Sequence, residues 1–334
     1  MLTVGYAAMT EQFHPTDLVR YCQLAQDNGF QSVMVSDHFH PWVPQQGQSA
    51  FVWSLLGAIG QATNLHFGTG VTPPGYRYHP AILAQAAATL EAMFPGRFYL
   101  GVGAGEALNE HVVGGYWPEP AARLDRLMES IEIIKKLFTG KVVKFHGEHF
   151  NVESAKLYTL PPQPPPIYVA TSGPIMAERT GRLTDGIITV GAADEKIKML
   201  LGRFARGARE AGKDPEKLAR IIQLHLSFAP TKELAVEQAV REWPNGGMNF
   251  PKQDIRNPED FEAMAKLVRP ENFVGRVFMS ADPEEFRAHI QHFLDLGFSE
   301  VDLHNVGRNQ EEFIRVFGEK VIPQLHEAAP SGVA

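Results

Sequence analysis

Two histidines, a carboxylate and a tryptophan lie close together between Ser36 and Trp42, where the sequence is Ser-Asp-His-Phe-His-Pro-Trp. A histidine can accept a proton near neutral pH, a neighbouring carboxylate can orient it, and an indole ring can line the pocket of a planar ligand. A structural turn around a half-buried aromatic side chain would use the same residue types. Their density directly after a predicted strand favours catalysis by His38, Asp37 and Trp42.

A second candidate is the glycine-rich segment from Gly101 to Asn109, which also follows a predicted strand. It superficially resembles the dinucleotide fingerprint G-x-G-x-x-G, but Glu106 stands where the third glycine is required and no helix clearly begins inside the run. We expect the glycines to let the main chain approach a flat ring or a phosphate, and Glu106 to exchange a proton. A glycine-rich barrel corner is the structural alternative.

Weaker signals lie at two further strand ends. The segment from Gly68 to Pro74 contains two prolines that force an extended exit, which suits a structural bend and cofactor support equally. In the segment from Ala170 to Pro174, free N–H groups at a helix start can hold a phosphate, although ordinary capping by Ser172 explains the same residues. Lys252 and Arg276 can bind an anionic substrate, but isolated basic residues usually remain solvated.

The elements that position these segments alternate regularly between short apolar runs and amphipathic helical patterns. Eight such strands favour a closed (β/α)8 barrel over an open doubly wound sheet, which shares much of the pattern. In a parallel barrel, binding groups collect in the loops after the strands. The expected strands are 3–7, 32–35, 66–70, 98–102, 167–170, 186–190, 221–228 and 301–304, and the expected helices are 15–28, 51–63, 80–93, 121–138, 175–183, 195–211, 233–242, 286–296 and 310–325.

Two segments interrupt this alternation. Residues 142–145 and 149–152 flank a His-Gly-Glu turn, which predicts a hairpin outside the barrel, and residues 243–270 are rich in Pro, Gly and Asn, which predicts a long insertion. We expect residues 1–326 to form a single barrel domain with insertion segments and residues 327–334 to form a C-terminal tail.

Composition restricts the function classes. A formal net charge of −7 provides no broad cationic field for nucleic acid or anionic lipid. The first residues lack a signal-peptide pattern and no later run is long and apolar enough to cross a bilayer, so we expect a cytoplasmic protein. Cys22 is the only cysteine, which excludes an internal disulfide and a thiolate metal cage, and its helical spacing indicates a packing role.

Four of these segments together resemble one known family. The sequences Ser-Asp-His-Phe-His-Pro-Trp, Gly-Val-Gly-Ala-Gly-Glu-Ala-Leu-Asn-Glu, Arg-Tyr-His-Pro-Ala with a downstream Ala-Gln, and Ala-Thr-Ser-Gly-Pro are similar to the coenzyme F420-dependent glucose-6-phosphate dehydrogenases of the luciferase-like superfamily. The likeness extends from Val4 to about Leu325. It implies a bacterial luciferase-like (β/α)8 barrel, a homodimer, and coenzyme F420, a deazaflavin, in the barrel mouth.

The resemblance also implies roles for individual residues. His38, Glu106, Trp42 and Asp37 fall on the family's active-site positions, and the Gly70–Val71 bond falls where the family has a non-prolyl cis peptide. Trp42, Lys252, Gln253 and Arg276 fall on substrate-binding positions. The implied cofactor-binding residues are Asp37, Gly70, Val71, Gly103, Ala104, Gly105, Glu106, Asn109, Thr171, Ser172 and Gly173.

The substrate positions depart from the sugar-phosphate pattern. Lys252 and Arg276 match two of the family's three phosphate-binding cations, whereas the third position is Ala193 and an active-site histidine is replaced by Gln253. The stretch from Thr189 to Ala193 is closer to that of the similar F420-dependent secondary alcohol dehydrogenases. We retain a sugar 6-phosphate as the expected substrate because the two remaining cations would otherwise have no role.

The implied mechanism is hydride transfer from a C–OH carbon to C5 of the deazaflavin. His38 would remove the hydroxyl proton, Trp42 would pack beside the transferring centre, Glu106 would supply a proton near N1, and Asp37 would tune the protonation of the site. Three alternatives remain open: an FMN-dependent monooxygenase on the same barrel, a non-enzymatic cofactor-binding protein, and a metal-dependent hydrolase that would use the His38 and His40 pair with Asp302 and His304.

Overall fold

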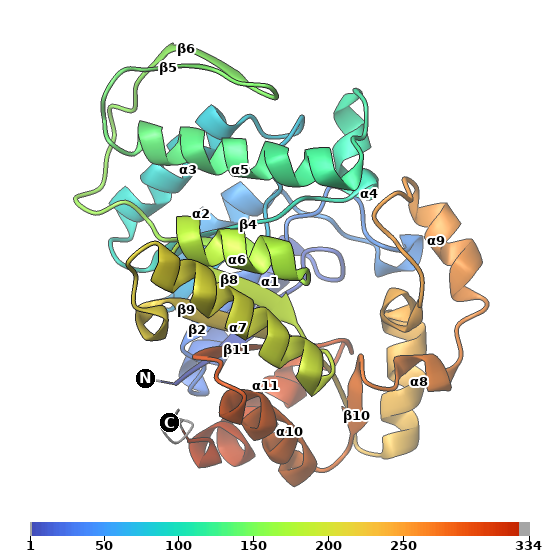
Figure 1. The fold of residues 1–334 in the computed structure, drawn as a ribbon. Helices are drawn as coiled ribbons and strands as arrows, with labels where there is room; N and C mark the ends of the chain where they lie inside the picture. The colour runs from blue at the N-terminus through green and yellow to red at the C-terminus, as the bar shows by residue number, and fades with distance from the viewer. Residues whose placement is uncertain (1, 327–334) are drawn as a thin grey trace.

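The computed structural model describes residues 2–326, and the expected tail at 327–334 lies outside them. Within the described part, eight parallel strands close into a barrel (Figure 1), which confirms the expected fold class. The barrel strands are β1 (Thr3–Ala8), β2 (Ser32–Val35), β3 (His66–Thr69), β4 (Phe98–Val102), β7 (Ile167–Ala170), β8 (Gly186–Val190), β9 (Ala219–Phe228) and β11 (Glu300–Asn305).

The pairing of neighbouring strands continues around the whole barrel, so the sheet closes on itself. β1 pairs in parallel with β2 on one side and with β11 on the other, where Gly5 lies opposite Asp302. β8 pairs with β9, which pairs in turn with β11. Because all barrel strands run the same way, the loops that follow them open at one end of the barrel.

Side-chain alternation along the strands separates two apolar layers. In β4, Phe98, Leu100 and Val102 belong to the large core between the strands and the surrounding helices. The side chain of Tyr99 points to the opposite face of β4. It packs with Met34, Ile188 and Ile221 from three other strands, so these side chains fill the barrel interior. The interior is therefore packed below the mouth.

Helices cover the outside of the barrel. Their N-termini repeatedly carry proline in the first turn, which suits the position because proline has no N–H to leave unpaired. Cys22 is fully buried in the first of them, as its spacing predicts. The helices are α1 (Pro15–Asp27), α2 (Val52–Ala62), α3 (Pro80–Met93), α5 (Pro120–Leu137), α6 (Pro174–Leu183), α7 (Asp194–Glu210), α8 (Lys232–Glu242), α10 (Pro283–Asp295) and α11 (Gln310–Lys320).

Several elements lie outside this alternation. Strands β5 (Val143–His146) and β6 (Asn151–Ala155) form the expected separate hairpin, which extends beyond α5 at the edge of the molecule (Figure 1). The short helix α4 (Ala107–Glu110) begins inside the segment from Gly101 to Asn109, where the sequence does not clearly predict a helix. The insertion contains helix α9 (Pro258–Ala265), which lies with α8 on one side of the barrel (Figure 1).

The structure differs from the expected elements in several places. Helices α4 and α9 are not among the expected helices, and β1, β9 and β11 are each longer than expected. A strand β10 (Phe278–Ser280) pairs with the end of β9, and its three residues are too short to leave a periodic pattern. The last helix ends at Lys320 rather than at Leu325, because Pro323 cannot continue it and a 3-10 turn follows. Among residues 2–326, none of the helices has the length and apolar character that crossing a bilayer requires.

Candidate active site

A cavity of about 940 Å³ opens where the strands of the barrel end. This volume lies near the upper end of the range for small-molecule sites, so it can hold a large cofactor together with a substrate. All the site residues expected from the sequence line it, although they come from segments far apart in the chain. They are Asp37, His38, Trp42, Gly70, Val71, Gly103, Ala104, Gly105, Glu106, Asn109, Thr171, Ser172, Gly173, Lys252, Gln253 and Arg276.

The loops after β3 and β4 approach each other closely. The Gly70–Val71 peptide bond is cis, as expected. Thr72 N donates to Gly101 O at 2.9 Å, and a Cβ placed on Gly103 would meet the Val71 side chain at 2.7 Å. Glycine is therefore required at position 103 for this approach, which leaves main chain at the cavity wall.

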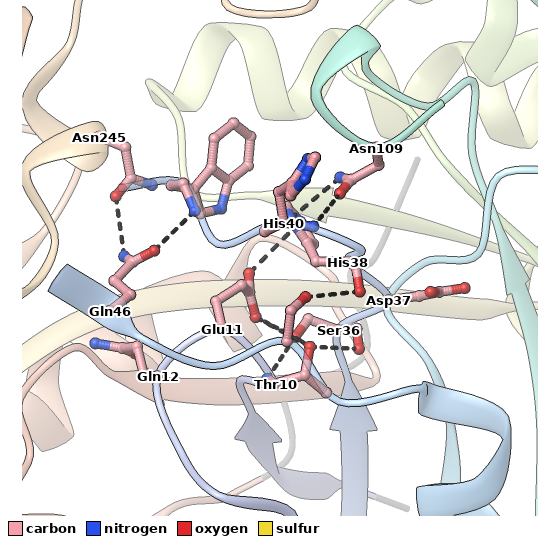
Figure 2. A network of polar contacts seen from close by, with 12 residues as sticks. Thr10, Glu11, Gln12, Ser36, Asp37, His38, His40, Gln46, Asn109 and Asn245 are labelled. Atoms are coloured by element: carbon pink, nitrogen blue, oxygen red, sulfur yellow. Dashed lines mark hydrogen bonds and ion pairs between the residues drawn. The ribbon is translucent and has the colours of Figure 1, made fainter. Parts of the chain in front are cut away.

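His38 is held between an acidic side chain and an amide (Figure 2). Its Nε2 lies 3.5 Å from Oε1 of Glu11, and its Nδ1 lies 3.1 Å from both the carbonyl oxygen of His40 and Nδ2 of Asn109. The Asn109 side chain is fixed because its Oδ1 accepts from the N–H groups of Phe39 and His40. Nδ1 thus faces one acceptor, the His40 carbonyl, and one donor, Nδ2 of Asn109. Only the tautomer in which Nδ1 donates to the carbonyl leaves Nε2 free to accept a proton beside the Glu11 carboxylate.

Glu11 itself is deeply buried, with 1% of its surface exposed. Its carboxylate accepts hydrogen bonds from the hydroxyls of Ser36 and Thr10, as Figure 2 shows. A carboxylate held in this way is a fixed negative group beside the imidazole, and it restrains the position of the His38 ring. The sequence analysis missed Glu11, although its position directly after β1 is the same kind of strand end as the others.

Asp37 has different partners from those that its place beside His38 suggests. Its carboxylate accepts from Thr72 Oγ1 at 2.6 Å, Arg77 Nη1 at 2.9 Å and Tyr78 Oη at 3.3 Å. Arg77 also contacts Glu110. These contacts tie the loops after β2 and β3 together, and the carboxylate facing His38 belongs to Glu11.

Glu106 reaches the cavity from the loop after β4, where it immediately precedes α4. Burial raises the pKa of its carboxyl, while the nearby His38 and Lys252 lower it by a smaller amount. The net direction is upward, so Glu106 retains a proton at higher pH than an exposed glutamate. This property suits a proton donor.

Three cationic side chains also line the cavity: Lys252, Arg276 and Lys196. Lys252 Nζ donates to the Asn245 carbonyl at 2.8 Å and lies 5.7 Å from the centre of the Trp42 ring, and burial lowers its pKa. Arg276 contacts the main chain of Met248 and the side chain of Asn249. Lys196 in the first turn of α7 also lines the cavity, a residue that the sequence analysis did not single out.

The insertion that carries Lys252 and Gln253 is attached to the glycine-rich loop. Ala107 N donates to the Gln253 carbonyl at 2.7 Å, and Asp254 accepts from Trp117 Nε1 at 2.8 Å and Arg123 Nη1 at 3.1 Å. These bonds place the insertion over the mouth of the barrel, within reach of the residues after β4.

The residues considered for a metal-dependent hydrolase do not converge. No group of three or more His, Cys, Asp or Glu side chains with metal-binding geometry occurs within residues 2–326. His40 Nδ1 contacts the Leu108 carbonyl at 3.0 Å, and His304 contacts another histidine inside the barrel. Asp302 is fully buried opposite Gly5 on β1.

Comparison with known proteins gives consistent results. A family model described as luciferase-like monooxygenase matches residues 2–300. The F420-dependent glucose-6-phosphate dehydrogenase of Microbacterium testaceum (strain StLB037) is 37% identical over 330 residues, which cover 98% of each chain. The enzyme of the same name from Amycolatopsis mediterranei (strain U-32) is 38% identical, with 97% of this chain and 99% of that one covered.

Solved structures agree with these relatives. An F420-dependent secondary alcohol dehydrogenase in complex with an F420-acetone adduct superimposes with a TM-score of 0.92 at 36% identity, covering 98% of this chain and 99% of the other. The coenzyme F420-dependent tetrahydromethanopterin reductase of Methanopyrus kandleri has a TM-score of 0.81 at 21% identity, covers 97% and 99% of the two chains, and shares the fold.

Proposed function

We propose a function that starts from the family to which this chain belongs, the luciferase-like monooxygenases. The protein is an oxidoreductase that uses coenzyme F420 to oxidise a C–OH group. The observation that carries the proposal is the single cavity shared by His38, Glu106 and the glycine-rich loop. Relatives at 37% identity over nearly the whole length carry F420-dependent dehydrogenase names, and so does the structure with a TM-score of 0.92.

The side chains and loops of the cavity fit such a cofactor. Gly70, Val71 and the Gly103 to Gly105 loop offer main chain and a small apolar face, which suit a flat ring. Thr171, Ser172 and Gly173 precede α6, where the first N–H groups of the helix have no partner within it, so they suit a phosphate. When bound, coenzyme F420 supplies the acceptor for the hydride.

Side chains of the protein can accept the proton released by the substrate hydroxyl and hold the proton that the reduced cofactor needs. Oxidation of an alcohol releases a proton from its oxygen as a hydride leaves carbon, and Nε2 of His38 is placed to accept that proton. The Glu11 carboxylate, 3.5 Å away, stabilises the imidazolium that results. Trp42, whose ring centre lies 5.0 Å from that of His38, closes the site beside it. Glu106 holds the second proton at its carboxyl.

The cations favour a phosphorylated sugar as the substrate. Lys252, Arg276 and Lys196 line the same cavity, and together they can neutralise a phosphate that a simple alcohol would not bring. Lys196 offers a third positive charge close to the position where Ala193 replaces the cation of the glucose-6-phosphate dehydrogenases. A hexose 6-phosphate is therefore our first substrate.

A secondary alcohol is the second candidate. The TM-score of 0.92 to an F420-dependent secondary alcohol dehydrogenase favours it, together with the stretch from Thr189 to Ala193. Purified protein should be mixed with F420 and either hexose 6-phosphates or secondary alcohols while the absorbance of the oxidised cofactor is followed. Loss of absorbance with phosphorylated sugars supports our first substrate. If the protein oxidises secondary alcohols but no phosphorylated sugar, Lys252 and Arg276 do not bind a substrate phosphate.

A parallel titration with FMN distinguishes the monooxygenase alternative. We expect saturable binding of F420 and weak binding of FMN. Tight binding of FMN without binding of F420 would refute the proposal, and binding of F420 without reduction by any substrate in the panel would indicate a cofactor-binding protein without this activity. The cytoplasmic location expected from the sequence stays a prediction.

We also propose a homodimer, which the exposed face of α3 supports. Ile82 and Met93 are 57% and 55% exposed, and the other exposed positions of this helix, Gln85 and Thr89, carry no charge. An uncharged stripe with large apolar residues at both ends is unusual for a solvated helix surface. A second copy of this chain would cover it.

A further inference from the structure

Two histidines from neighbouring strands contact each other inside the barrel, close to the cavity. Nδ1 of His225 on β9 lies 2.8 Å from Nδ1 of His304 on β11. Nε2 of His304 lies 3.2 Å from Oε1 of Gln12. The Trp243 ring packs against both, with its centre 5.7 Å from that of His225 and 4.5 Å from that of His304. The orientation of both imidazoles is therefore fixed.

The Gln12 amide determines where the protons lie in this chain of contacts. Its Nε2 donates to the carbonyl oxygen of Val306 at 2.9 Å and faces that of Glu242 at 3.4 Å. A rotation that exchanged the two amide atoms would place Oε1 against these carbonyl oxygens, which cannot donate. Oε1 therefore accepts, and Nε2 of His304 must carry a hydrogen.

The same reasoning extends to His225. Burial lowers the pKa of His304 well below its usual value, so the ring is neutral and its Nδ1 is a bare acceptor once Nε2 carries the hydrogen. Nδ1 of His225 must then donate to it. Burial also lowers the pKa of His225 to about 4, so this ring is neutral as well and its Nε2 presents an unprotonated lone pair.

His225 lines the cavity beside Gln223 and Lys252, and its Nε2 has no hydrogen-bond partner among residues 2–326. An unprotonated imidazole nitrogen accepts a hydrogen bond from a hydroxyl and repels a carbonyl or a phosphate oxygen, which bring no proton. We propose that His225 is a substrate-binding residue whose Nε2 accepts a hydrogen bond from a second hydroxyl of a polyhydroxylated substrate.

This inference rests on the proposed oxidoreductase function and deepens it. An alcohol with one hydroxyl uses that group at His38 and leaves Nε2 of His225 without a donor. A sugar or polyol brings further hydroxyls, so the His225 nitrogen distinguishes the two substrate classes. Gln12 and His304 are positioning residues, because they touch the substrate only through the tautomer that they impose on His225.

The tautomer can be measured without cofactor or substrate. Nitrogen-15 NMR of the full chain labelled at histidine, assigned with the His225→Phe variant, distinguishes protonated from bare ring nitrogens. We expect His225 in the unliganded protein to carry its hydrogen on Nδ1 at pH 7. A hydrogen on Nε2 of His225 would overturn the inference, whatever the protein does with F420.

The second measurement compares substrate classes. His225→Phe should lower kcat/KM for a hexose 6-phosphate or another polyol by about tenfold, as expected for one lost hydrogen bond, and leave kcat/KM for 2-propanol within about twofold. Binding of F420 to the variant shows that its site is folded. An equal loss with both substrates would contradict a specific role for His225.

A matched control is His289→Phe. The His289 ring is also largely buried, stacks on Phe278 at 4.1 Å between ring centres, and does not line the cavity. This variant should change neither kcat/KM value. If no substrate reduces F420 with the unsubstituted protein, the proposed function fails, whereas the tautomer measurement still decides the state of His225.

Discussion

The contact between His38 and Glu11 joins the ends of two adjacent strands through side chains alone. Glu11 is buried beside hydroxyl groups that hold its carboxylate, and the imidazole lies against it. The carboxylate lies 3.5 Å from Nε2 of His38 and takes no part in bond breaking, so we assign it the role of holding the imidazole in place. The pair therefore fixes where the proton acceptor of the site lies.

Replacement of His38 by alanine should lower kcat by on the order of a hundredfold or more, because the substrate hydroxyl loses its proton acceptor. The dissociation constant of F420 should change little, since all the residues assigned to the cofactor except Asp37 lie on the loops after β3, β4 and β7. Steady-state kinetics and a binding titration check the two parts. His66→Ala, at the exposed start of β3, is the matched control, and equal turnover in the two variants would remove His38 from the mechanism.

Glu106 gives a prediction that depends on pH. Burial raises the pKa of its carboxyl in the folded protein, so folding favours the protonated form. The charged form therefore costs stability, and this cost is absent below the unfolded pKa, grows as pH rises toward the folded pKa, and persists above it. Glu106→Gln should consequently raise Tm above that of the unsubstituted protein at pH 8.

The gain in Tm should narrow as pH falls into the usual range of glutamate titration. The same variant should lose turnover, because glutamine cannot supply a proton. Thermal unfolding across a pH series and kinetics at a single pH measure the two effects. A lower Tm for Glu106→Gln at pH 8 would show that the charged carboxylate is stabilised by its neighbours.

At the scale of elements, the insertion over the barrel mouth depends on few bonds. Asp254 accepts from Trp117 and Arg123, and it directly follows the two substrate positions Lys252 and Gln253. Asp254→Ala should raise KM for the substrate about fivefold with little change in kcat, because roughly 1 kcal/mol of hydrogen bonding that orders the segment is lost.

Asp260→Ala is the control for this prediction, since Asp260 lies in the same insertion and its side chain contacts Asn257 at the start of α9. It should leave KM unchanged. If Asp254→Ala lowers kcat and leaves KM unchanged, the prediction is wrong. The substitution would then disturb the glycine-rich loop and not the substrate positions of the insertion.

Element order and several strand boundaries could be predicted because glycine and proline separate the apolar runs. Strands β2, β4, β7 and β8 occupy the residues that the sequence predicts, and the loops after three of them hold site residues. Glu11 was missed because Thr-Glu-Gln after β1 has no distinctive composition. His225 could not be found from sequence, because its role depends on a partner 79 residues away that strand pairing brings beside it.

At the scale of the whole molecule, the uncharged face of α3 predicts the assembly. Sedimentation equilibrium should give a mass close to twice 37.0 kDa. Ile82→Lys should shift the protein toward the monomer, because a charge at one end of the uncharged stripe would be buried in the contact without a partner. Lys198→Glu, on an exposed position of α7, is a control that should remain dimeric. A monomeric unsubstituted protein would refute the proposal.

The distribution of site residues along the chain has an evolutionary consequence. Lys252, Gln253 and Arg276 all lie between β9 and α10, whereas the residues assigned to the cofactor lie on loops that end before α6. The bond from Ala107 to Gln253 uses main-chain atoms alone, so it tolerates new side chains. Recombination of this one continuous stretch would thus exchange three of the substrate contacts, while His225, Lys196 and the inherited redox chemistry are preserved.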